Sequence, residues 1–137
     1  MDLDKARDFI REHHRAVMAT RRADGAPQMS IVAANVDADG RVIVSTRETA
    51  VKTKNLLRDP HVSFCMLPDD GWYGQWIQVD GTATVLSLPE AMEPLVEYYR
   101  STAGEHPDWD DYRAAMERER RVLVRVDLER AGPDVAG

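Results

Sequence analysis

The chain has 137 residues, enough for one domain with a single core, and its 43% hydrophobic and 31% charged content is typical of a globular protein. The net charge of −6 argues against general binding to nucleic acid or anionic membranes, which need a broad basic surface. The sequence shows no apolar run of the roughly 20 residues that span a bilayer and no apolar signal region. The single Cys65 excludes an internal disulfide, so we expect a cytoplasmic protein.

The first third of the chain predicts one helix followed by three strands. Residues 3–13 carry apolar side chains at helical spacing after Asp2, which can cap a helix. Alternating polarity then predicts strands at residues 15–22, 28–37 and 41–46. Because short turn-forming sequences separate them, we expect an antiparallel meander.

A basic stretch follows the third strand. Residues 47–58 contain four basic side chains and one acidic one, a local charge of +3 in an acidic chain. The pattern predicts a turn and a short helix, capped by Thr49 and ended before Pro60. Unpaired amides at a helix start favour an anion, and Ser45 and Thr46 add hydroxyl groups beside them. The stretch is a candidate site for a small anion such as a phosphate, although an ordinary solvated helix face has the same pattern.

The second half of the chain predicts three more strands and two helices. The strands are expected at residues 61–67, 75–86 and 121–130, and the helices at residues 88–102 and 109–119. Ser87 with Glu90 forms a capping box, and Asp108 can cap the second helix. Gly81 in the middle of a long strand predicts a bulge. Cys65 lies within a strand without a second cysteine or a helix start to activate it, so we interpret it as a packing residue.

Two groups of residues allow either a packing or a ligand-binding interpretation. They are the small residues Ser30, Ala33 and Ala34 and the aromatic residues Trp72, Tyr73 and Trp76. The small residues could pack against a neighbouring element or leave room for a flat ligand on the sheet. The aromatic residues could form core or dimer-interface packing, or one of them could form the wall of a ring-binding pocket.

Six antiparallel strands with three or four helices fit a small closed or partly split β-barrel better than a single open layer. We expect one domain over residues 1–130 and a flexible tail over residues 131–137. The sequence contains no G-x-G-x-x-G, G-x-x-x-x-G-K-[ST], H-E-x-x-H, C-x-x-C or G-x-S-x-G motif. The carboxylates around His106 are interpreted as helix-start residues rather than metal ligands. Because no acid–base pair is evident, any catalysis is expected to use a bound cofactor.

Several stretches resemble the flavin-binding split barrels related to pyridoxamine 5′-phosphate oxidase. They are VDGTA at residues 79–83, KTKNLLRDP at residues 52–60, DDGW at residues 69–72 and YRSTAGEHPDWDDYR at residues 99–113. The last three stretches look most like the actinobacterial oxidoreductases that depend on the deazaflavin coenzyme F420. The resemblance spans nearly the whole chain and implies a six-stranded antiparallel Greek-key barrel of the FMN-binding split-barrel type.

The resemblance also implies a homodimer with two cofactor sites at the subunit interface. In such a site Lys52 and Asn55 reach the cofactor phosphate, Lys54 lies nearby, and Ser45 and Thr46 lie on the strand beneath it. The cofactor ring is then lined by four residues of the second strand and by a tryptophan of the partner subunit. These residues are Gln28, Met29, Ser30, Val32 and Trp72. Ala50 departs from relatives that carry a basic residue there, which removes one contact to the anionic tail of the coenzyme.

The chemistry implied is hydride transfer from reduced F420 to an electron-poor double bond of an unidentified small organic substrate. Solvent or a bound water would supply the proton, since the sequence shows no dedicated acid. The residues that hold pyridoxamine phosphate in the true oxidases are not recognisable, so that activity is not inferred. The alternatives are an FMN-binding oxidase or reductase on the same barrel, and a protein that carries a cofactor or haem without turnover.

Overall fold

A computed structural model of the chain describes residues 1–69 and 74–135. These described residues contain four helices and seven strands. The helices are α1 (Leu3–Glu12), α2 (Val51–Arg58), α3 (Met92–Ala103) and α4 (Trp109–Arg118). The strands are β1 (Arg15–Arg21), β2 (Pro27–Ala33), β3 (Asn35–Val36), β4 (Val42–Arg47), β5 (His61–Met66), β6 (Ile77–Leu86) and β7 (Arg121–Gly132). Within these described ranges no helix is long and apolar enough to cross a membrane.

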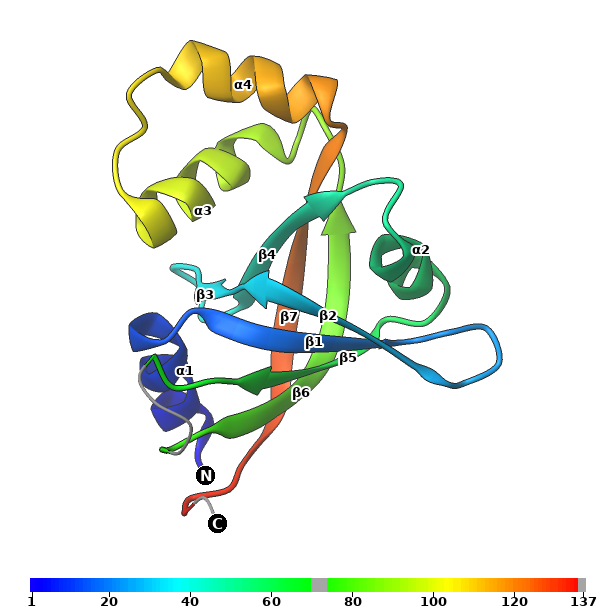
Figure 1. Ribbon diagram of the computed structural model, residues 1–137, viewed down its shortest axis with the longest axis vertical. Coiled ribbons are helices and arrows are strands. Elements are labelled where there is room, and N and C mark those ends of the chain that lie inside the picture. The colour runs from blue at the N-terminus through cyan, green and yellow to red at the C-terminus, as the bar shows by residue number, and fades with distance from the viewer. Residues whose placement is uncertain (70–73, 136–137) are drawn as a thin grey trace.

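The strands form one antiparallel sheet in the order β2-β1-β5-β6-β7-β4-β3. The sheet curls, so that β1 and β2 lie in front of β4, β6 and β7 (Figure 1). β2 and β4 come close together, but in the described part of the chain no ladder of backbone hydrogen bonds joins them. The fold is therefore a partly closed, mainly β barrel with helices, which confirms the predicted class.

The strand predicted at residues 28–37 is wrong in one respect, because its two halves lie at opposite edges of the sheet. β2 pairs with β1, whereas β3 pairs with β4. The break falls at Ala34, whose N–H donates to the carbonyl oxygen of His14 at 2.7 Å. Asn35 is then buried and donates to the carbonyl oxygen of Ser101 at 3.2 Å. The expected meander is also wrong, since β4 pairs with β3 and β7 and not with β2. In the part of the chain that the structure describes, the sheet has seven strands where six were predicted.

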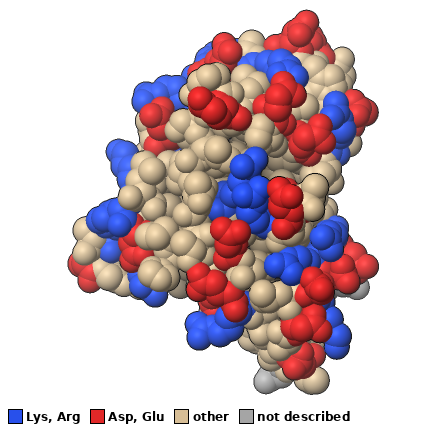
Figure 2. All heavy atoms as spheres, turned by 180° about the vertical axis from the view of Figure 1, so that it is seen from behind, with Lys and Arg blue, Asp and Glu red and all other residues tan. Residues whose placement is uncertain are grey.

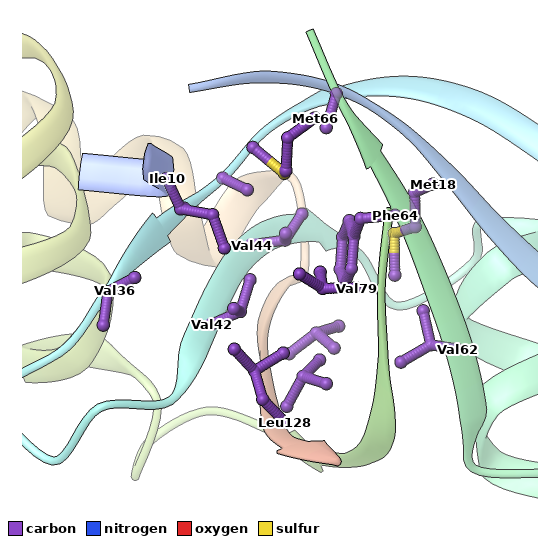
Figure 3. Packing of buried hydrophobic residues seen from close by; sticks show 14 of the residues in the cluster. Ile10, Met18, Val36, Val42, Val44, Val62, Phe64, Met66, Val79 and Leu128 are labelled. Atoms are coloured by element: carbon purple, nitrogen blue, oxygen red, sulfur yellow. The ribbon is translucent and has the colours of Figure 1, made fainter. Parts of the chain in front are cut away.

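Apolar side chains at every second position of the strands fill the interior of the barrel. On β5, Val62, Phe64 and Met66 are all buried, and these are the residues that the sequence placed on one face. Phe64 stands among the labelled side chains beside Val79 (Figure 3). Helix α1 covers one end of this core with Ile10, which is fully buried. The barrel interior and α1 thus share one hydrophobic core.

A second core lies outside the barrel. Helices α3 and α4 pack over the outer face of β4 and β7, where Ile43 and Leu123 meet Leu95 and Met116. Figure 1 shows this helical pair at one end of the sheet and α2 at its side. The outer face of β1 and β2 has no helix over it in the same view.

The predicted caps of α1 and α4 are confirmed, and that of α2 is wrong. Asp2 and Asp108 each accept from a backbone N–H of the first turn. In α2 the N-cap is Ala50 rather than Thr49. The reason is a turn before the helix, in which the Ala50 N–H donates to the carbonyl oxygen of Arg47 at 3.1 Å. Thr53 closes the same turn by donating from Oγ1 to that oxygen at 2.6 Å.

The predicted capping box of Ser87 and Glu90 is also wrong. Helix α3 begins at Met92, and its N-cap Ala91 makes no side-chain hydrogen bond. Residues 87–91 form turns instead, with the Ala91 N–H donating to the carbonyl oxygen of Ser87 at 2.9 Å. Ala91 is fully buried in the second core, so packing of this residue makes α3 begin after Ser87 and Glu90, the two predicted capping residues.

The predicted bulge at Gly81 is confirmed. The register between β6 and β7 shifts between Asp80 and Gly81. A Cβ atom at Gly81 would lie 2.3 Å from the carbonyl oxygen of Asp127. The close approach of these two strands, which bends the sheet, therefore depends on a residue without a side chain.

We predict that Gly81→Ala lowers the free energy of unfolding by about 1–3 kcal/mol, because the added methyl group must displace the β7 backbone. Gly132→Ala is the matched control, since Gly132 lies on the same ladder and its Cβ would meet no atom within 4 Å. Denaturant unfolding measures both variants. Equal stability of the two variants would contradict the close approach at Gly81.

Candidate functional site

The opening between β2 and β4 is the candidate site, and we call it the slot. β2 stands at the end of the sheet order, so one of its edges has no strand beside it in the described residues. β4 pairs with β3 only at Val42 and Ile43, which leaves one edge of residues 44–47 open as well. Two free strand edges that face each other offer backbone N–H and carbonyl groups to a ligand.

Two side chains bridge the slot. Lys52 on α2 donates from Nζ to Oγ of Ser30 on β2 at 3.2 Å. Tyr98 on α3 donates from its hydroxyl to the carbonyl oxygen of Ala33 at 2.7 Å. Burial raises the pKa of the Tyr98 phenol, so it stays protonated and can keep this bond at neutral pH. Helices α2 and α3 thus each hold the free edge of β2 through one polar contact.

Positive charge gathers at the slot. Lys52 is half-buried, and its pKa is lowered first by burial and then by the nearby charge of Arg121. Arg121 begins β7, directly opposite Arg47 on β4. Glu119 accepts from Arg121 at 2.9 Å and from Arg47 at 3.2 Å. Two arginines thus share one carboxylate, and an anion bound beside Lys52 would reduce the repulsion between Lys52 and Arg121.

Asn55 belongs to a buried hydrogen-bond network next to the slot. Its Nδ2 donates to Oγ1 of Thr20 at 3.0 Å, and Thr20 donates to Oε1 of Gln28 at 2.9 Å. Its Oδ1 accepts from Arg58 at 3.1 Å, and the Asn55 side chain is almost fully buried. The network ties α2 to β1 and β2. In this structure Asn55 supports the slot from behind, with both ends of its amide bonded to protein.

The remaining predicted site residues divide between the two faces of β2 and the elements around it. Gln28, Ser30 and Val32 are half-buried on one face, whereas Met29 is 62% exposed on the other. Around them, Ser45 is half-buried, Thr46 is buried and Lys54 is exposed on the solvent side of α2; Trp72 lies outside the described residues. The helix phase that placed Lys52 and Asn55 on one face and Lys54 on another is therefore confirmed.

Sequence reasoning missed two residues at the slot, Tyr98 and Arg121. Arg121 was interpreted only as the first residue of the last strand, and its position beside Lys52 depends on the pairing of β7 with β4. Tyr98 lies one residue before the stretch that carries the resemblance. No local pattern marks either residue, because both reach the slot through non-local packing.

The stretch at residues 99–113 spans the end of α3, the connecting loop and the first half of α4. The rings of Tyr99, His106, Trp109 and Tyr112 lie with centroids 5.0–5.8 Å apart. Tyr112 also donates to the carbonyl oxygen of Leu95 at 2.8 Å, and burial raises its pKa to about 12. These contacts fix α4 against α3 and so set the position of Tyr98.

Two other candidate groups have structural explanations. His106 accepts on Nδ1 from the backbone N–H of Asp108 at 2.9 Å, and Asp108 caps α4. In residues 1–69 and 74–135 no group of three or more His, Cys, Asp or Glu side chains could hold a metal ion. Cys65 is half-buried, and burial raises the pKa of its thiol, which keeps it a weak nucleophile.

Comparison with known proteins gives one family and several solved structures. The sequence model of the family described as Pyridoxamine 5′-phosphate oxidase matches residues 3–132. The conserved hypothetical protein Rv2991 from Mycobacterium tuberculosis is 26% identical, with a TM-score of 0.73 over 100% of this chain and 93% of that one. A structure described as F420 Reductase is 17% identical, with a TM-score of 0.71 over 91% and 94%. HutZ from Vibrio cholerae, described as a haem storage protein, is 19% identical, with a TM-score of 0.68 over 96% and 94%.

We predict that Arg121→Met raises the pKa of Lys52, because it removes a positive charge that disfavours the protonated ammonium. The pKa should stay below that of an exposed lysine, since burial is the larger cause. An NMR titration of the Lys52 side chain measures it. Arg118→Met, which removes an exposed arginine at the end of α4, is the control and should leave the pKa of Lys52 unchanged. An unchanged value in Arg121→Met would disprove the coupling.

Proposed function

The chain belongs to the pyridoxamine 5′-phosphate oxidase family, and from this premise we propose that it is an oxidoreductase that uses reduced coenzyme F420 to reduce a small organic substrate. Proteins of this family typically bind a flavin, either FMN or F420. The observation that carries the proposal is the slot, where Lys52 donates to Ser30 at a free strand edge within electrostatic range of Arg121. The structure described as F420 Reductase has the same fold, which supports the choice of cofactor.

The groups at the slot fit a cofactor with one phosphate. Lys52 and Arg121 supply two positive charges, and Ser30 and Ser45 supply hydroxyl donors. The first backbone hydrogen bond of α2 is donated by Lys54 and the Ala50 amide is used in the preceding turn, so the amides of residues 51–53 are the ones available to an anion. A lysine that is partly desolvated and repelled by an arginine gains most from a bound phosphate.

When bound, reduced F420 supplies a hydride to an electron-poor double bond. The protein contributes orientation and shielding from water. Asn55 and its network hold α2 and β2 at a fixed separation, so Lys52 is positioned before the cofactor arrives. Tyr98 covers the opening from the side of α3 and keeps its proton. No carboxylate or histidine among the described residues is hydrogen-bonded to Ser30, Lys52 or Tyr98, and we assign the proton of the reduction to solvent.

FMN is the alternative cofactor, since the phosphate-binding groups of the slot would serve it equally. Absorbance of the purified protein separates the possibilities. Bound FMN gives a yellow protein and haem gives a Soret band, whereas F420 is lost on expression in a host that does not make it. A colourless protein that binds added F420 is the result expected here.

We also propose that the protein is a homodimer through the outer face of β1 and β2. Met29 and Ile31 are 62% and 66% exposed on this face. Cross-strand pairing places Ala19 and Val17 beside them, and both of these are half-buried. Figure 1 shows no helix over this face, and contiguous apolar surface of this kind marks protein interfaces. By the family resemblance the partner subunit would bring its Trp72, which lies outside the described residues, to the cofactor.

We predict that the chain sediments as a dimer at micromolar concentration and that Ile31→Lys shifts it to the monomer, because a buried unpaired ammonium is costly. Leu57→Lys is the control, as Leu57 is 69% exposed on α2 rather than on this face. Analytical ultracentrifugation distinguishes the two states. A monomeric parent chain, or a dimer that both variants leave intact, would refute the proposed interface.

We predict that Lys52→Ala raises the dissociation constant for F420 roughly ten- to a hundredfold, the value of one charge-assisted contact. The loss should be smaller at high salt, because part of the attraction is screened. Lys54→Ala should have less effect, since Lys54 is on the solvent side of α2. Fluorescence quenching of F420 at two salt concentrations measures all three proteins. Tight binding by Lys52→Ala would place the site elsewhere.

A further inference from the structure

A groove lies between α3 and the β3–β4 hairpin, over the outer face of β7. It encloses about 420 Å³, and none of its lining residues is one of the slot residues described above. Five apolar residues contribute to its lining, namely Val36, Ala38, Ile43, Pro94 and Leu123. Arg125 lines the same groove from the middle of β7. The groove therefore combines an apolar surface with a guanidinium group.

Four carboxylates also line the groove, and each is already paired. Glu93 pairs with Arg113 at 2.6 Å, Glu97 with Arg100, and Asp37 and Asp39 with Arg41 at 3.3 and 2.9 Å. This alternation of sign agrees with Figure 2, where basic and acidic side chains lie next to one another over the back of the molecule. The acidic residues therefore do not leave an unbalanced negative site.

Arg125 is the charged side chain of the groove that has no such pairing in the described residues. Its Nε is buried and has no hydrogen-bond partner, and no residue in the described part of the chain forms an ion pair with it. Arg125 as a whole is half-buried and lines the groove, and its Nη atoms are not among the buried atoms that lack a partner. Cross-strand pairing places Ile43 on one side of Arg125 and Thr84 on the other, and neither can balance its charge. A buried polar atom without a partner is costly, and a guanidinium is best satisfied by a planar two-oxygen anion.

We propose that this groove binds a small monocarboxylate with an apolar body. The carboxylate would accept from the Nη groups of Arg125, as guanidinium and carboxylate match in shape and charge. The apolar body would cover Ile43 and Leu123 and remove them from water. A dianion such as phosphate is less suitable, because Arg125 is the one groove cation left without an ion pair in the described residues and balances a single negative charge.

The experiment is an NMR titration of the ¹⁵N-labelled full chain with benzoate, benzylamine and inorganic phosphate. Benzoate is expected to give saturable shifts at the amides of Ile43, Leu123 and neighbouring groove residues. Benzylamine has the same ring without the anion, and phosphate has the anion without the ring, so neither should produce these shifts. Absence of saturable benzoate shifts in the groove, or equal shifts with benzylamine, would overturn the proposal.

Arg125→Met is the variant that tests the anchor. It removes a polar atom that has no partner, so the fold should survive with unchanged or higher thermal stability. Benzoate affinity should fall roughly ten- to a hundredfold. Arg118→Met, on the exposed end of α4, should keep the parent affinity. Equal affinity in Arg125→Met would exclude a carboxylate site at this residue. F420 binding should be the same in both variants, so this result is separable from the proposal for the slot.

Discussion

The incomplete closure of the barrel is the constraint on which the rest of the structure depends. β2 lies close to β4, but the backbone ladder that would seal the barrel between them is missing from the described residues. Side chains replace it, with Lys52 bound to Ser30 and Tyr98 bound to the carbonyl oxygen of Ala33. A sheet edge held by single side-chain contacts stays accessible to a ligand, which a sealed ladder would not allow.

The two helical elements can be understood from their contacts with this opening. α2 brings Lys52 to the slot and is tied to the barrel by the buried Asn55. The α3–α4 hairpin brings Tyr98, and its aromatic cluster keeps the hairpin rigid. Two of the stretches that carry the family resemblance, residues 52–60 and 99–113, thus have the same structural role. They hold the polar groups of the slot in place from outside the barrel.

Local patterns were sufficient for most of the fold. Alternation placed Val62, Phe64 and Met66 in the core, and the glycine within a long strand located the bulge at Gly81. The sequence failed where partners are distant along the chain. The break at Ala34 depends on His14. The start of α2 is a separate, local failure, because it depends on a turn closed by Arg47 just before the helix.

The candidate site was predicted only in part for the same reason. Lys52 could be found because it lies in a local run of basic residues. Arg121 and Tyr98 could not, because strand pairing and helix packing bring them to the slot from the last third of the chain. Periodicity specifies which face a residue occupies, but it does not specify which strand lies beside it.

The most direct test of the central claim is a double-mutant cycle for F420 binding with Lys52→Ala and Arg121→Met. If both side chains contact one phosphate in the slot, their effects are coupled, and the double variant should depart from additivity by about 0.5 kcal/mol or more. In the control cycle, Lys52→Ala is combined with Arg118→Met, and the effects of these two substitutions on F420 binding should be additive. Additivity of Lys52→Ala with Arg121→Met, or full affinity in the double variant, would contradict a shared anion site between β2 and β4.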